Sequence, residues 1–170
     1  ASTATSVMLI GFACGSPLAG WLSQKLQRRK MPFTVGFFIA LVGWLALLVP
    51  DPLPLPAVYL LFLAIGIGSS VGILGFVIAR ERVGAELSGS ASAIINTCIM
   101  GAGALFQYMI GALLDLAWDG RMEAGIPAYS PDNYQMALLT LPAAVAIAFG
   151  AALLVRETFP GRGTGCDGVM

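Results

Sequence analysis

AVYLLFLAIGIGSSVGILGFVIA, which runs from Ala57 to Ala79, is the stretch of this sequence that decides its fold. It contains no charged residue, and a helix of about 20 apolar residues is long enough to cross the hydrocarbon core of a bilayer. The whole chain of 170 residues shares this character, because 58% of its residues are hydrophobic and only 11% are charged. A soluble domain carries about 25% charged residues, since its surface must face water. The sequence therefore predicts a membrane protein.

Four further stretches have the length and apolar character of a membrane-spanning helix. Polar or proline-rich connectors separate the spans at 24–31, 50–56, 80–89 and 118–134. The expected fold is all-α, with a transmembrane bundle over residues 1–156 and a glycine-rich, disordered cytoplasmic tail over 157–170. Pro17 and Pro142 are expected to kink their helices, because proline lacks the N–H group and clashes with the preceding turn. The five predicted spans are 3–23, 33–49, 57–79, 90–117 and 135–155.

The positive charges of the connectors fall on alternate links. Lysine and arginine concentrate on the cytoplasmic side of membrane proteins, and five spans place alternate connectors on opposite sides. Eight of the nine cationic residues lie in the 24–31 link, the 80–89 link and the tail, whereas the 118–134 connector holds Arg121 alone. The first span is therefore expected to run from outside inwards, with the C-terminus in the cytoplasm. The eight cations are Lys25, Arg28, Arg29, Lys30, Arg80, Arg82, Arg156 and Arg162.

Residue types that carry catalysis and metal binding are scarce. The chain has no histidine, which is the commonest general base and metal ligand. Its three cysteines are Cys14 and Cys98 in apolar stretches and Cys166 in the tail, a placement that does not indicate a disulfide framework or a metal cluster. The formal net charge is zero, so the chain has no basic surface for nucleic acid. We expect neither an enzyme nor a cofactor or metal site.

A loop motif joins the first two spans, GSPLAGWLSQKLQRRK at residues 15–30. Glycines let a helix end approach its neighbour closely, and the cations hold the loop at an anionic leaflet. The motif resembles the loop signature of the major facilitator superfamily, from which Gln24 departs where aspartate is usual and Gln27 where glycine is usual. The resemblance implies a loop that latches one conformation, with Gln24 limited to a neutral hydrogen bond. The alternative is that the cations only mark the cytoplasmic side. The motif residues are Gly15, Gly20, Ser23, Gln24, Lys25, Arg28 and Arg29.

The resemblance extends along most of the chain. A short acidic link containing serine and glycine at 86–92 leads into a glycine-rich span with Asn96 and Gln107 inside it, as in the penultimate helix of many bacterial members. The Arg-Glu-Thr sequence at 156–158 is similar to the common ending of the last span. The resemblance implies the C-terminal half of a twelve-helix transporter, equivalent to helices eight to twelve. Such a chain forms most of one six-helix bundle and needs the missing N-terminal half as its partner.

A transporter of this family is expected to move a small solute across the bacterial inner membrane by alternating access. It would act as a symporter or antiporter that uses a proton or sodium gradient. Two alternatives remain beside this one: a multidrug-type efflux transporter, and a truncated, non-transporting membrane remnant.

Polar residues inside the predicted spans are the candidates for the substrate path, because polar groups in a membrane are costly and are often functional. Asn96 and Gln107 are eleven residues apart, which places them within about 20° of each other on a helix, and Ser92 shares that face. The resemblance adds Ser69 and Ser70, since the equivalent helix lines the path. The alternative is that these groups form hydrogen bonds between helices. The glycines Gly11, Gly15, Gly36 and Gly43 are interpreted as packing faces.

Overall fold

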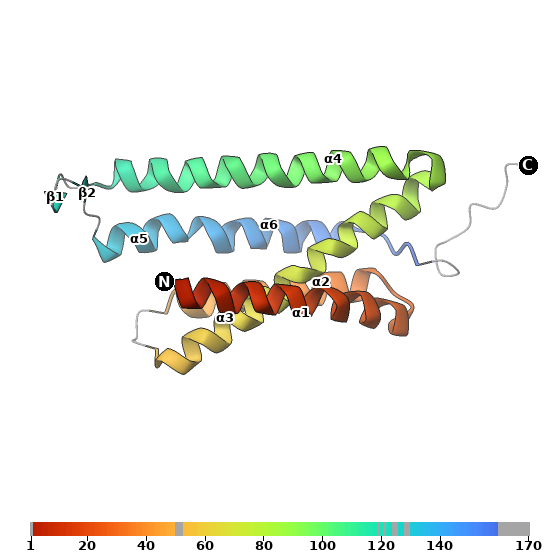
Figure 1. The fold of residues 1–170 in the computed structure, drawn as a ribbon, viewed down its shortest axis with the longest axis horizontal. Helices are drawn as coiled ribbons and strands as arrows, with labels where there is room; N and C mark the ends of the chain where they lie inside the picture. The colour runs from red at the N-terminus through yellow and green to blue at the C-terminus, as the bar shows by residue number, and fades with distance from the viewer. Residues whose placement is uncertain are drawn as a thin grey trace, which may run out of the picture.

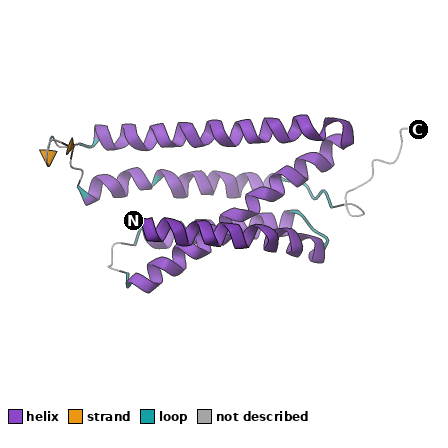
Figure 2. Cartoon of the chain, in the orientation of Figure 1, coloured by secondary structure: helices purple, strands orange, loops and turns teal. Residues whose placement is uncertain are grey.

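The computed structural model describes residues 2–49, 53–118, 120, 122–123, 126–127 and 130–159. Long helices dominate it, and a two-residue antiparallel strand pair lies in the connector between the fourth and fifth spans (Figures 1 and 2). The elements are α1 (Ser2–Leu26), α2 (Lys30–Leu47), α3 (Leu55–Ser69), the 3-10 turn η1 (Ser70–Gly72), α4 (Ile73–Leu116), β1 (Met122–Glu123), β2 (Ile126–Pro127), α5 (Pro131–Leu138) and α6 (Thr140–Leu154).

Five helical segments of the described chain are long and apolar enough to cross a membrane. Each overlaps one of the predicted spans, so the all-α membrane fold predicted from the sequence is confirmed. Residues 160–170 of the tail predicted over 157–170 lie outside the described residues, as does Arg121. Arg162 and Cys166 belong to that part of the tail. The five segments are Thr3–Leu26, Lys30–Leu47, Leu55–Val83, Ala85–Leu116 and Met136–Leu154.

The link expected at 80–89 is helical instead. Helix α4 continues through it, and the third and fourth spans meet at Gly84. The intervening alanine, arginine, glutamate and leucine residues are strong helix formers, so polarity alone was a poor guide to a helix end here. Figure 1 shows α4 crossing the other helices obliquely and then folding back on itself. Residues 85–116 consequently form a separate arm, which packs against α5.

Helix α3 is the centre of the packing, because it lies against both α1 and α2. A Cβ atom on Gly66 would meet the main-chain carbonyl of Met8 in α1, and one on Gly68 would lie 2.6 Å from the carbonyl oxygen of Gly36 in α2. A Cβ atom on Gly11 would lie 2.6 Å from the carbonyl oxygen of Leu63. These backbones approach too closely for any side chain at the contact.

The predicted packing faces are thereby confirmed. The remaining predicted positions have equally close neighbours: Gly15 lies against Ser70, Gly36 against Val71 and Gly43 against Ile65. Apolar side chains complete the interior, and Ala40 and Ile65 are almost fully buried.

The last span is interrupted at Leu139, between α5 and α6. Pro142 has no N–H to donate to the carbonyl group four residues earlier, and its ring crowds that turn. In the same turn, the hydroxyl of Thr140 donates to the carbonyl oxygen of Ala137 at 2.7 Å. The interruption lies within one turn of Pro142, where a kink was predicted, whereas α1 is uninterrupted at Pro17.

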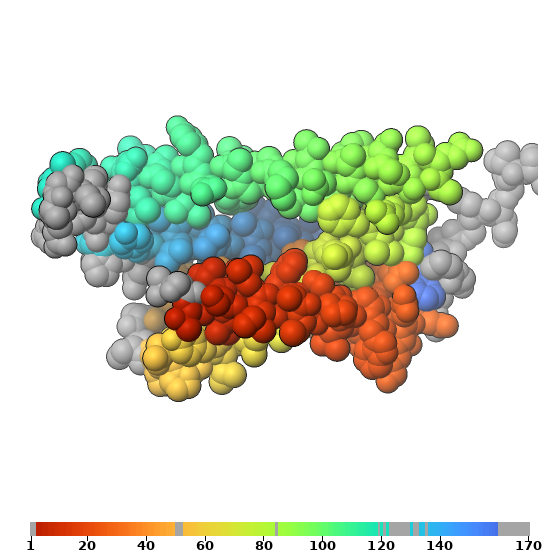
Figure 3. Space-filling model, in the orientation of Figure 1, coloured from red at the N-terminus to blue at the C-terminus, as the bar shows by residue number. Residues whose placement is uncertain are grey.

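The arm of α4 over residues 85–116 buries none of its most apolar window within the described chain. Figure 3 shows its outer surface uncovered along one edge of the molecule. Ile94, Met100, Leu105 and Tyr108 are among the large apolar side chains exposed there. A surface of this kind is suited to lipid or to a further part of the protein rather than to water.

Candidate functional site

Helix α1 ends in a Schellman motif, at the loop that the sequence singled out. The N–H of Gln27 bonds to the carbonyl oxygen of Gln24 at 3.1 Å, and the N–H of Arg28 bonds to that of Ser23 at 3.2 Å. Such a motif requires a left-handed residue directly after the helix, and Gln27 has a φ of 50°. Glycine is the residue that adopts this conformation most readily. The position where Gln27 departs from the expected motif is therefore the one where the backbone favours glycine.

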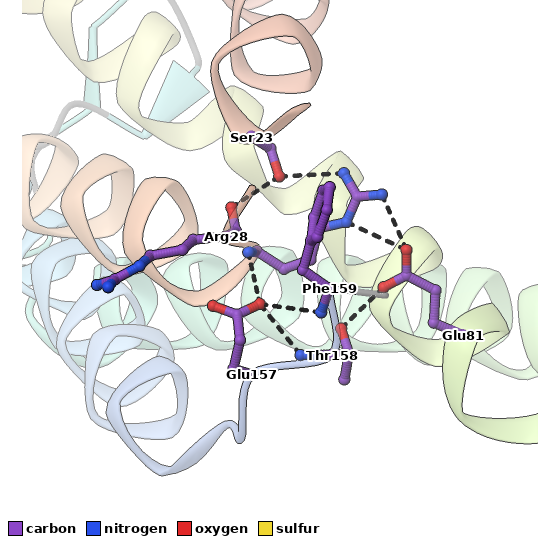
Figure 4. A network of polar contacts seen from close by, with 7 residues as sticks. Ser23, Arg28, Glu81, Glu157, Thr158 and Phe159 are labelled. Carbon is purple, nitrogen blue, oxygen red and sulfur yellow. Dashed lines mark hydrogen bonds and ion pairs between the residues drawn. The ribbon is translucent and has the colours of Figure 1, made fainter. Parts of the chain in front are cut away.

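Ser23 joins this turn to the side chain of Arg29. It is fully buried, and its hydroxyl donates to the carbonyl oxygen of Arg28 at 3.0 Å. The same oxygen accepts a hydrogen bond from Nη1 of Arg29 at 3.1 Å. Figure 4 shows Ser23 at one edge of the resulting network. A single buried hydroxyl thus orients both the loop backbone and a cation.

Arg29 connects the loop to α4 and to the segment after α6. Its Nε and Nη2 atoms donate to Oε1 of Glu81 at 3.1 and 2.8 Å, and the two side chains are only 12% and 19% exposed. Oε2 of Glu81 accepts a hydrogen bond from the hydroxyl of Thr158 at 2.8 Å. The guanidinium group also stacks on the ring of Phe159, 5.0 Å from its centroid. One ion pair therefore holds three separate parts of the chain together.

Glu157 caps the N-terminus of α2 from a distant part of the sequence. Its Oε1 accepts the N–H of Arg29 at 2.7 Å, and its Oε2 accepts that of Lys30 at 3.3 Å. The N–H groups of Thr158 and Phe159 bond to Oε1 as well, both at 3.1 Å. Burial raises the pKa of this carboxyl, but the four backbone N–H donors outweigh burial and hold the pKa below its ordinary value. A negative charge here also complements the positive end of the helix dipole.

The basic connectors gather at one end of the molecule, as the five-span topology requires. Nη2 of Arg82 donates to the carbonyl oxygen of Arg156 at 3.3 Å, and Nζ of Lys30 donates to that of Leu153 at 2.7 Å. The α1–α2 loop, the turn of α4 and the end of α6 are consequently neighbours. We call this region the basic end.

The other loop-motif residues have different surroundings. Gly15 packs tightly on Ser70, whereas a Cβ atom on Gly20 would meet nothing within 4 Å. Gln24 is exposed. Lys25 lies over the ring of Trp21, 4.8 Å from its centroid. Arg28 is exposed, and Figure 4 shows its side chain directed away from the network.

The substrate-path candidates do not form one cluster. Asn96 and Gln107 are exposed on the arm of α4. Ser92 lies at its start, where its hydroxyl accepts a hydrogen bond from Nε of Arg80 at 2.7 Å. Ser69 is half-buried, and Ser70 is fully buried against α1, with its hydroxyl bonded to the carbonyl oxygen of Ile67 at 2.6 Å.

Sequence reasoning missed the two carboxylates that organise the basic end. In the sequence Glu157 stands only as part of an Arg-Glu-Thr ending similar to that of the last span in the family, and Glu81 only as part of the polar link at 80–89. The arginines next to them in the sequence could have indicated this role. Where cations cluster on one side of a membrane protein, nearby carboxylates are their expected ion-pair partners. In the described part of the chain, no three histidine, cysteine, aspartate or glutamate residues gather as they would around a metal ion.

The sequence model of the Major Facilitator Superfamily matches residues 1–164. The chain belongs to this superfamily. It is therefore a multi-pass membrane protein from a family of transporters rather than of enzymes, and its helices belong to a bundle of the major-facilitator type. Comparison with curated proteins and with solved structures gives no match.

Proposed function

We propose that the chain is the C-terminal part of a secondary active transporter, equivalent to helices eight to twelve, which moves a small solute by alternating access. In this mechanism two bundles rock about a site between them. The membership of the superfamily carries the proposal. The missing N-terminal half would supply the other wall of the site, and a proton or sodium ion would supply the driving force.

The network at the basic end supports a rocking mechanism. Rocking requires each bundle to move as one body. Arg29 and its partners Ser23, Glu81 and Glu157 tie α1, the start of α2, α4 and the segment after α6 to one another. Gln24 is exposed beside this network. It is free to form a neutral hydrogen bond with the other bundle when the basic end is closed, which is the latch proposed for this loop.

The arm of α4 is the proposed wall of the substrate path. Asn96 and Gln107 are exposed polar residues on an otherwise apolar span. Polar groups facing lipid are costly, so their face of the arm is proposed to meet the solute path and the other bundle. Ser92 extends this face towards the basic end. Ser69 and Ser70 remain candidates through their place in the third span.

A transport assay tests this assignment. The complete transporter is reconstituted in liposomes under an imposed proton or sodium gradient, and uptake of a solute panel is compared with extrusion of cationic dyes. Asn96→Ala and Gln107→Ala should raise the KM for the solute, whereas Thr97→Ala, on a neighbouring face of the same arm, should not. Transport of dyes alone would favour the efflux alternative. Absence of any gradient-driven flux would favour the non-transporting remnant.

Cysteine labelling tests the proposed orientation, with the C-terminus in the cytoplasm of a bacterial inner membrane. In a background without Cys14, Cys98 and Cys166, Arg82→Cys should be labelled only from the cytoplasmic side and Trp118→Cys only from the outer side. Labelling of both from one side would refute the topology.

A further inference from the structure

Three hollows follow one another along α2. The first, of about 690 Å³, lies at the basic end, where α2 faces α6, and is lined in part by Arg28, Lys30 and Met31. The second, of about 170 Å³, shares Val35 with the first. The third, of about 200 Å³, shares Ile39 with the second. Together they reach from Met31 to Gly43, which is about 18 Å along a helix axis.

The first hollow, between α2 and the end of α6, is charged, whereas the two neighbouring ones, between α2 and α1 or α3, are apolar. We call the three hollows together the groove. None of the described residues that line the second and third hollows is charged. In the first, Arg28 and Lys30 share the lining with apolar residues such as Leu153. Val35, Ile39 and Val42 are exposed along the groove, so it opens on the apolar surface that the bilayer covers.

The charged end has unused hydrogen-bonding capacity for an anion. Lys30 uses one N–H of its ammonium group on the carbonyl oxygen of Leu153, and an ammonium group has three. Thr34 lines the same hollow, and its buried hydroxyl oxygen has no hydrogen-bond partner among the described residues. Among the described lining residues Glu157 is the one carboxylate, and its two oxygens already accept four backbone N–H groups.

We propose that this groove binds one anionic phospholipid of the leaflet at the basic end. Its phosphate lies between Arg28, Lys30 and Thr34, and one acyl chain follows Val35 and Ile39 along α2. A soluble anion would use only the charged end, whereas the exposed apolar side chains that follow it along α2, Val35, Ile39 and Val42, suit a ligand that carries a hydrocarbon tail. The proposal depends on the chain spanning a bilayer and not on any transported solute.

Native mass spectrometry of the purified, delipidated full chain in neutral detergent tests the proposal. Phosphatidylglycerol is titrated against phosphatidylcholine with the same acyl chains, and soluble glycerol 3-phosphate serves as competitor. The test variant is Arg28→Gln with Lys30→Gln, which retains side-chain donors but removes both charges. The matched control is Lys25→Gln with Arg80→Gln, which removes two cations of the same end that do not line the groove.

We expect the wild-type chain to bind phosphatidylglycerol more tightly than phosphatidylcholine. The test variant should bind it about thirty-fold more weakly, because each cation near a phosphate contributes about a five-fold gain in affinity. The control should stay within about twofold of wild type. Val35→Trp, which fills the junction of the first two hollows, should weaken phosphatidylglycerol binding while leaving the helical circular dichroism unchanged.

Three results would overturn the proposal. Equal affinity for the two lipids would show that the groove does not select an anionic headgroup. An equal loss in the control would show a general effect of charge. Full displacement by glycerol 3-phosphate, with no effect of Val35→Trp, would show a site for a soluble anion. None of these results bears on solute flux, so this proposal and the transport proposal fail separately.

Discussion

Replacing Glu157 by glutamine is the sharpest perturbation of the basic end. Oε1 of Glu157 accepts the N–H groups of Arg29, Thr158 and Phe159, and Oε2 accepts that of Lys30. Glutamine can place its one carbonyl oxygen at the Oε1 position, but its NH₂ group then faces the N–H of Lys30, which loses its acceptor. The other three bonds change from charge-assisted to neutral.

The size of the effect follows from these bonds. A hydrogen bond to a charged group contributes about 1.5–3 kcal/mol and a neutral one about 0.5–1.5 kcal/mol. The site is partly open to solvent, which screens the charge. We therefore expect the local opening free energy at the N-terminus of α2 to fall by about 1–2 kcal/mol, or roughly 5- to 30-fold in the opening equilibrium.

Hydrogen exchange of the amides at 29–31, measured on the full chain in detergent micelles, reports this local opening. Exchange should accelerate in Glu157→Gln by that factor, while the amides in the middle of α3 stay unchanged. Glu86→Gln is the matched control, because Glu86 is exposed on α4 and its replacement changes the net charge equally. Unchanged exchange at 29–31, or an equal acceleration in the control, would refute the role of Glu157 as a cap.

Three further predictions concern the same region and the helix contacts. Burial raises the pKa of Glu157, but the four backbone N–H groups outweigh burial and hold this pKa below 4.5. The stabilisation that Glu157 gives to the start of α2 is therefore present above pH 4.5 and is lost as the pH falls through the lowered pKa. The protection of the amides at 29–31 against hydrogen exchange, corrected for intrinsic exchange, should fall in that pH range in the wild type and stay constant in Glu157→Gln. Gln27→Gly should stabilise the chain by about 0.5 kcal/mol, because the strain of the left-handed conformation that glycine relieves exceeds the entropy that glycine adds to the unfolded chain. Gln24→Gly, inside helix α1, should instead destabilise it by about 1 kcal/mol. Denaturation in mixed micelles measures both variants, and equal effects would contradict the assignment of Gln27 to the left-handed position. Gly66→Ala should lower the free energy of unfolding by about 1–3 kcal/mol, because the added Cβ atom overpacks against the backbone of α1. Gly20→Ala should be neutral or slightly stabilising, because its Cβ atom would meet nothing within 4 Å. Thermal unfolding in detergent distinguishes the two variants.

The spans and the packing glycines could be predicted because they follow from local properties of the chain. A span such as 57–79 is recognised from its length and lack of charge. Glycines at helical spacing, such as Gly11 and Gly15, mark a face where another backbone can approach. The prediction of a link between helices at 80–89 was wrong, because the polarity of this segment resembles that of a loop although its residues favour helix.

The candidate site was predictable only in part. The cationic loop at 24–31 was found, since charge patterns along the chain show where a membrane protein meets water. Its partners were not found. Glu81 lies 52 positions and Glu157 lies 128 positions from Arg29, and no local pattern indicates which carboxylate meets which cation.

Hydropathy and charge along the chain were therefore enough to establish a five-span membrane protein with most of its cations in alternate connectors, because lipid imposes its requirement on each segment separately. The pairing of Arg29 with Glu81, the capping of α2 by Glu157 and the groove along α2 depend on how the helices are placed in space. Hydrogen bonds and hollows form between segments that are distant in the chain, so only the packed structure brings their two sides together.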